Sequence, residues 1–124
     1  MNILLTNTGR KTYIVKYFEE LRKRYKFDIY LMDSNKFVSS FAVSKTTKNF
    51  VSPQSSLKEK YSKYIKKFVK KKKINLIFPL TNWEIPILAD LKNYFKKNNI
   101  EVIVSEKPVI KTCLNKLLMM KKLK

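Results

Sequence analysis

The sequence has little of several residue types, and each scarcity excludes a kind of chemistry. It contains no histidine, so catalysis by histidine and metal sites built on histidine are excluded. Its single cysteine, Cys113, cannot form an internal disulfide, and we interpret it as a packing residue on an apolar helical stripe. No apolar run approaches the length of a membrane span, and the first residues do not form a signal peptide. We therefore expect a cytoplasmic chain that has no metal site of its own.

Glycine is as scarce as cysteine, and the only one, Gly9, lies where a tight turn needs it. It follows the apolar run Ile3–Leu5 and precedes a helical pattern that begins near Thr12. A strand that turns sharply into a helix leaves free backbone N–H groups, which favour an anion together with the helix dipole. Arg10 and Lys11 add positive charge at the same turn. Two interpretations stay open, an anion or substrate contact and a plain turn with solvated basic residues.

Positive charge, in contrast, is abundant. The 124 residues carry 28 Lys+Arg against 9 Asp+Glu, a formal net charge of +19, and 44% of them are hydrophobic, enough for one folded domain. Such a charge predicts weak, nonspecific, salt-sensitive binding to polyanions. The densest run spans residues 66–73 and lies mostly opposite an apolar stripe. We interpret it as a solvated helix face, and nonspecific attraction to nucleic acid or a membrane surface is the alternative.

Apolar residues alternate between short continuous runs and longer stripes of helical spacing. This alternation predicts a Rossmann-like α/β fold, a doubly wound, mostly parallel five-stranded sheet with helices on both faces. The carboxyl ends of parallel strands share one edge, so segments 6–11, 33–35 and 81–84 are expected to meet where such sheets bind ligands. The expected strands are 2–6, 27–32, 49–52, 74–80 and 101–105; the expected helices are 12–24, 56–72, 84–97 and 108–124, with a short helix or loop at 37–43.

Polar residues follow two of these strands. Asp33 stands where nucleotide-binding folds place a ribose-binding acid, but the glycine-rich fingerprint is absent, so we favour an Asx-turn. Asn82, Trp83 and Glu84 follow the fourth strand, where capping of the next helix explains most of the pattern. The alternative is that Asn82 and Glu84 face the crevice and hold a cationic or amide-bearing substrate group, with Trp83 stacked or packed beside it.

Four stretches of the chain resemble, in the same order, the amino-terminal pre-ATP-grasp domain of ATP-grasp ligases. The run Leu-Leu-Thr-Asn-Thr-Gly-Arg-Lys-Thr-Tyr within residues 2–18 is similar to the opening of the carbamoyl-phosphate-synthase large-subunit-like group. Met-Asp-Ser at 32–34, Pro-Leu-Thr-Asn-Trp-Glu within 78–89 and Leu-Asn-Lys at 114–116 are similar to later landmarks of that group. The chain departs from the pattern at Asn82 and Asn115, where the family often has an acid.

The resemblance implies a function for the predicted sheet edge. Family members activate a carboxylate with ATP as an acyl phosphate, which an amine then attacks, and the amino-terminal domain contributes substrate contacts. By that analogy Gly9, Arg10, Asp33, Asn82 and Glu84 bind substrate, and the chain contains no catalytic residue of its own. ATP and Mg²⁺ are implied for the full-length protein, with no cofactor held by this chain.

The resemblance also implies a partner. We expect residues 1–112 to form the pre-ATP-grasp domain and 113–124 to lead toward an ATP-grasp domain that this sequence lacks, supplied by the same or a separate chain. The apolar last helix is then expected to fray, to exchange between copies or to form a homodimer. Two other classes remain open: a small basic polyanion- or nucleic-acid-binding protein, and a dinucleotide-dependent oxidoreductase, against which the missing glycines argue.

Overall fold

Within residues 1–103, five strands form one sheet in which every neighbouring pair is parallel. The computed structural model describes residues 1–103, and the spatial order of the strands in this part is β3-β2-β1-β4-β5. The chain therefore builds outward from β1 to β3 and then crosses to the other side of β1, which makes the gap between β1 and β4 the topological switch point. The strands are β1 (Asn2–Thr6), β2 (Asp28–Asp33), β3 (Lys48–Val51), β4 (Leu76–Pro79) and β5 (Glu101–Val102).

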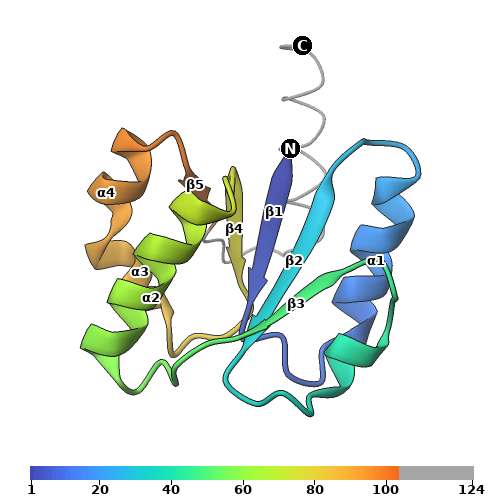
Figure 1. Ribbon diagram of the computed structural model, residues 1–124, viewed down its shortest axis with the longest axis horizontal. Coiled ribbons are helices and arrows are strands. Elements are labelled where there is room, and N and C mark those ends of the chain that lie inside the picture. The colour runs from blue at the N-terminus through green and yellow to red at the C-terminus, as the bar shows by residue number, and fades with distance from the viewer. Residues whose placement is uncertain (104–124) are drawn as a thin grey trace.

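Helices cover both faces of the sheet, as the alternating pattern predicts. In Figure 1 the sheet is seen close to edge-on, with α1 and η1 on one side and α2, α3 and α4 on the other. The doubly wound, Rossmann-like fold is thus confirmed for the described residues. The helices are α1 (Thr12–Arg22), the short 3₁₀ helix η1 (Ser39–Ala42), α2 (Lys58–Lys71), α3 (Ile85–Asp90) and α4 (Lys92–Lys97).

Two hydrophobic clusters fill the space between the sheet and its helices. Alternate residues of a strand point to opposite faces, so Ile3 and Leu5 of β1 join the cluster under α1, while Leu4 joins the cluster under α2, α3 and α4. Thr6, the last residue of β1, continues the alternation on the same face as Leu4. Its hydroxyl is therefore directed toward α2 and α3, where the candidate site is built.

The prediction of one continuous helix at 84–97 is wrong at Leu91. The Leu91 N–H is shared between the carbonyl oxygens of Ile87 and Leu88, at 3.3 and 3.2 Å, so the backbone tightens there and separates α3 from α4. The expected helix at 108–124, with Cys113 and Asn115, lies outside the described residues, as does the boundary at 112. No helix within residues 1–103 has the length and apolar character needed to span a membrane.

Candidate functional site at the carboxyl edge of the sheet

The turn from β1 into α1 uses two residues in the left-handed region. Asn7 has φ +51° and Gly9 has φ +47°. No atom lies within 4 Å of the position that a Cβ of Gly9 would take, so the backbone conformation alone makes glycine the favoured residue. Asn7 is one of the few other residue types that adopt this conformation readily. The turn thus depends on the chain's only glycine, as the sequence predicts.

Asp33 at the end of β2 holds this turn in place. Its Oδ2 accepts a hydrogen bond from the Gly9 N–H at 2.8 Å, and its Oδ1 accepts one from the Asn35 N–H at 2.9 Å. The second contact confirms the Asx-turn that we favoured. Because a protein carboxylate already binds the Gly9 amide, that amide is not free for an external anion, and the cations left at the turn are the exposed Arg10 and its neighbour Lys11.

The same turn is also fixed by η1. The Ser40 N–H donates to the Gly9 carbonyl oxygen at 3.2 Å, and the Ser40 hydroxyl donates to the Thr8 Oγ1 at 2.7 Å. Both hydroxyl-bearing residues are fully buried. The segment between β2 and β3 therefore supports the turn from the α1 side of the sheet.

Glu84 closes the switch point from the other side. Thr6 Oγ1 donates to its Oε1, while Asn7 Nδ2 and Tyr61 Oη donate to its Oε2, the last at 3.1 Å. Glu84 is 0% exposed. One carboxyl group therefore joins the end of β1, the first turn of α2 and the start of α3.

Burial changes the titration of this carboxyl group. Desolvation raises the pKa of Glu84 to about 7, and the hydrogen bonds from Thr6, Tyr61 and the backbone at Leu80, with the charge of Lys11, offset only part of that rise. Burial, followed by the neighbouring Glu84 charge, also raises the pKa of Tyr61 above its usual range. Tyr61 is thus a hydrogen-bond donor, and Glu84 changes charge near neutral pH.

An open pocket of about 630 Å³ lies beside this network. It is lined by Lys11 and the turn after β4, residues 80–83. Lys11 Nζ donates to the Leu80 carbonyl oxygen across the switch point. The buried Thr81 Oγ1 has no hydrogen-bond partner among the described residues, and the Trp83 side chain is 82% exposed. The pocket therefore combines a cation, polar groups and a free aromatic surface.

The structure brings most of the predicted site residues to one edge. Gly9 and Asp33 are in direct contact, and Asn82 lines the pocket. Glu84 lies behind the pocket, bound by protein groups, so its role as a substrate ligand stays a prediction, as does that of Arg10.

Sequence reasoning missed three residues of the network. Thr6 and Asn7 belong to the segment 6–11 that was expected at this edge but have no individual role in that prediction, and Tyr61 falls in the expected helix 56–72. A hydroxyl group on an otherwise apolar stripe was the available signal for Tyr61, because a buried tyrosine hydroxyl needs a partner.

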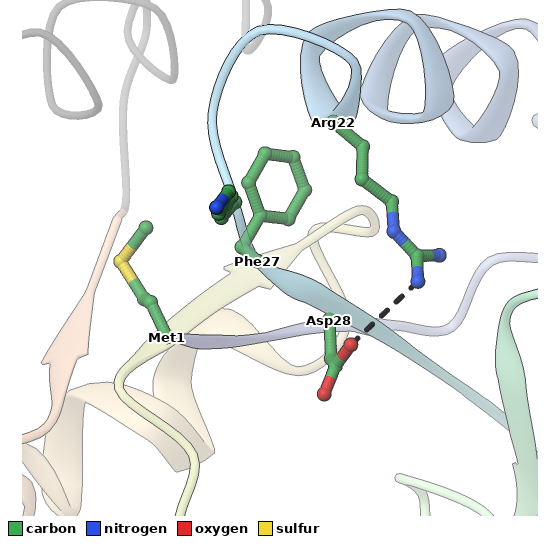
Figure 2. Close-up of a pocket in the computed structure, with 5 residues that line it drawn as sticks. Met1, Arg22, Phe27 and Asp28 are labelled. Carbon is green, nitrogen blue, oxygen red and sulfur yellow. Dashed lines mark ion pairs between the residues drawn. The ribbon is translucent and has the colours of Figure 1, made fainter.

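A second hollow, of about 370 Å³, lies near the amino ends of β1 and β2, away from this edge. Figure 2 shows Arg22 directed toward Asp28, and their nearest charged atoms are 3.6 Å apart. Lys48 pairs with the same carboxylate at 3.7 Å. Since its carboxylate is already paired within the protein and none of the predicted site residues line it, we do not assign a ligand to this hollow.

Comparison with solved structures supports the fold. The chain is similar to dTDP-glucose 4,6-dehydratase from Bacillus anthracis strain Ames, solved in complex with NAD, with a TM-score of 0.54 and 14% identity. The match covers 82% of this chain and 36% of the dehydratase, so the chain spans about a third of that protein's length. At this identity the likeness shows the fold alone.

Comparison with curated proteins gives no match. The family model of the PylC-like N-terminal domain, in contrast, matches residues 3–103, which is most of the chain and nearly all of its described part. The match includes the turns that follow β1 and β4, which form the candidate site, and α2, which carries Tyr61. The chain therefore belongs to the PylC-like N-terminal domain family, the pre-ATP-grasp domain found at the amino terminus of ATP-grasp ligases.

Proposed function

We propose that this chain is the substrate-side domain of an ATP-dependent carboxylate–amine ligase of the carbamoyl-phosphate-synthase-like group, acting in the cytoplasm. The observation that carries the proposal is the family match over residues 3–103. The carboxyl edge of the sheet supports it, because a parallel sheet binds ligands at its switch point and this one has an open pocket there. The domain's task is to hold and orient the carboxylate substrate, not to transfer phosphate.

Arg10 and Lys11 are the groups that suit such a substrate. A guanidinium at a helix start can form charge-assisted hydrogen bonds to a carboxylate or an acyl phosphate. Lys11 lines the pocket and Arg10 is its exposed neighbour in the chain. Asn82, which lines the same pocket, offers a neutral polar contact.

ATP and Mg²⁺ belong, in this proposal, to the ATP-grasp domain that accompanies the chain. Residues 1–103 contain no group of three or more acidic, cysteine or histidine side chains placed to hold a metal ion. When bound elsewhere, ATP would supply the phosphoryl group that activates the carboxylate. We therefore expect the chain on its own to release no ADP from MgATP.

Binding of an acyl-phosphate analogue tests the proposal. Acetyl phosphate is expected to shift the backbone amide signals of Gly9, Arg10 and Asn82 in a two-dimensional NMR titration. Loss of one charge-assisted hydrogen bond costs roughly 1.5–3 kcal/mol, so Arg10→Ala is expected to weaken binding about tenfold or more. Arg24→Ala removes an exposed arginine beyond the far end of α1 and is the matched control. Equal weakening by both variants, or shifts confined to other residues, would contradict the proposal.

A further inference from the structure

The side of the sheet covered by α2, α3 and α4 carries a concentrated positive charge. Residues 58–73, which include α2, contain nine lysines and one glutamate. Residues 92–97, which form α4, contain three lysines and no acid. Figure 1 shows both helices on the same side of the sheet. The charge is therefore a property of one side of the molecule.

Helical spacing directs the α2 lysines to the solvent. Tyr61 and Ile65 are fully buried against the sheet. Lys63, Lys67 and Lys70 project from the opposite surface of the helix and are exposed. Their ammonium groups are therefore accessible to a large partner.

Tyr94 joins the two helices into one surface. The Nζ atoms of Lys66 and Lys70 lie 5.1 and 5.3 Å from the centre of its ring, so two lysines of α2 stand over one aromatic residue of α4. Lys97 is exposed and three residues after Tyr94, so helical spacing places it beside that ring. We call this surface the lysine face; it consists of Lys63, Lys66, Lys67, Lys70 and Lys97.

Ion pairing differs between the two sides of the sheet. On the α1 side, Arg22 pairs with Glu19 at 3.6 Å and Lys23 with Glu20 at 3.1 Å. Among the described residues, no member of the lysine face has an ion pair; the pair on that side, Lys58–Asp90, lies at the start of α2. Acidic side chains of the described residues therefore do not offset the repulsion between the ammonium groups of the lysine face. An external polyanion would offset it.

We infer that the lysine face binds the phosphodiester backbone of a nucleic acid without reading its sequence. The face contains no arginine, so it lacks the planar, rigid guanidinium fork that is best suited to reading a base edge. Lysine point charges suit backbone phosphates and produce sequence-independent binding.

The surface chemistry of the lysine face argues against an anionic membrane and against an acidic protein as its partner. The exposed large hydrophobic side chains of the described residues are all outside it; they are Tyr13, Phe37, Val51, Leu57 and Trp83. A membrane surface is held by inserted apolar residues as well as by charge. A protein partner needs an interface core rich in aromatic residues and poor in charge.

Fluorescence anisotropy with a labelled 20-base-pair duplex of mixed sequence tests the inference. Five phosphate contacts predict a log–log salt slope of about −4.5, which is roughly a 500-fold loss of affinity between 50 and 200 mM salt. In the triple variant Lys63→Gln/Lys67→Gln/Lys70→Gln the slope is expected to fall to about −2 and the loss to about 12-fold. A duplex of scrambled sequence is expected to bind equally well.

A variant that loses the same number of charges elsewhere distinguishes the effect of the lysine face on binding from the effect of overall net charge. Lys16→Gln/Arg24→Gln/Lys26→Gln removes three exposed cations from the α1 side and is expected to keep the wild-type slope. Arg10→Ala is also expected to leave duplex binding unchanged, which keeps this result independent of the proposed substrate site. Thermal melting checks that each variant is folded.

Several results would overturn the inference. The first is an equal loss of slope in both triple variants, and the second is the absence of duplex binding at 50 mM salt. The third is tighter binding, at the same salt, to another polyanion than to the duplex. Tighter binding to polyglutamate would assign the face to an acidic protein, and tighter binding to vesicles of anionic lipid would assign it to a membrane.

Discussion

At the scale of single residues, Glu84 makes the folded state sensitive to pH. Its pKa in the folded chain is raised to about 7 from an ordinary value of 4.5, so between these values the folded state holds a proton that the unfolded state has released. Stability is therefore expected to fall as pH rises through this window, by about 3 kcal/mol between pH 4.5 and pH 8. Urea unfolding at a series of pH values measures this fall, and the chain has no histidine to titrate in the same range.

Two variants identify the group responsible. Glu84→Gln removes the titration and is expected to flatten the pH dependence over this window, whereas Glu59→Gln, which removes an exposed acid in the first turn of α2, is expected to leave it as in the wild type. The same slope in wild type and Glu84→Gln would show that the buried carboxyl group is not the source.

At the scale of elements, α1 depends on one aromatic contact with the sheet. Phe18 is fully buried, and its ring centre lies 5.3 Å from that of Phe78 in β4 and 6.5 Å from that of Phe27. Phe18→Ala is expected to destabilise the protein by about 3–5 kcal/mol, since it leaves a cavity between helix and strand. The midpoint of urea unfolding measures the change.

The same helix supplies the control. Tyr13 is 61% exposed, so Tyr13→Ala is expected to change stability by no more than about 0.5 kcal/mol. Phe18→Leu fills part of the cavity, so its loss of stability is expected to lie between those of Tyr13→Ala and Phe18→Ala. This variant keeps the comparison measurable if Phe18→Ala does not fold. Similar effects of Tyr13→Ala and Phe18→Ala would contradict the assigned packing.

The positions of the helices and strands could be predicted from the sequence, whereas contacts between distant residues could not. Apolar runs and stripes report burial along the chain, and they located the strands and helices to within about two residues for most elements. Gly9 located the turn, since a positive φ has a residue signature. The Tyr61–Glu84 contact joins residues 23 apart and leaves no local pattern. The break at Leu91 was missed for the opposite reason, because the apolar spacing continues through it.

At the scale of the whole molecule, like charge opposes folding. The 9 acidic residues can neutralise at most as many of the 28 Lys+Arg, which leaves a formal excess of +19. The ion pairs of residues 1–103 are all partly exposed, and such pairs contribute about 0–1 kcal/mol each. Repulsion is therefore the larger electrostatic effect, and a compact chain experiences it more strongly than an unfolded one.

Salt is consequently expected to stabilise this protein. The screening length shortens from about 30 Å at 0.01 M to about 10 Å at 0.1 M ionic strength, which spans the separations between lysines on one small domain. The urea midpoint is expected to rise between 0.01 and 0.1 M sodium chloride. The Lys63→Gln/Lys67→Gln/Lys70→Gln variant loses three charges from the lysine-rich helix α2, so its midpoint is expected to start higher at low salt and to rise less. A midpoint that falls with salt would mean that the exposed ion pairs outweigh the excess of lysine, and would contradict the charge balance on which the lysine face also depends.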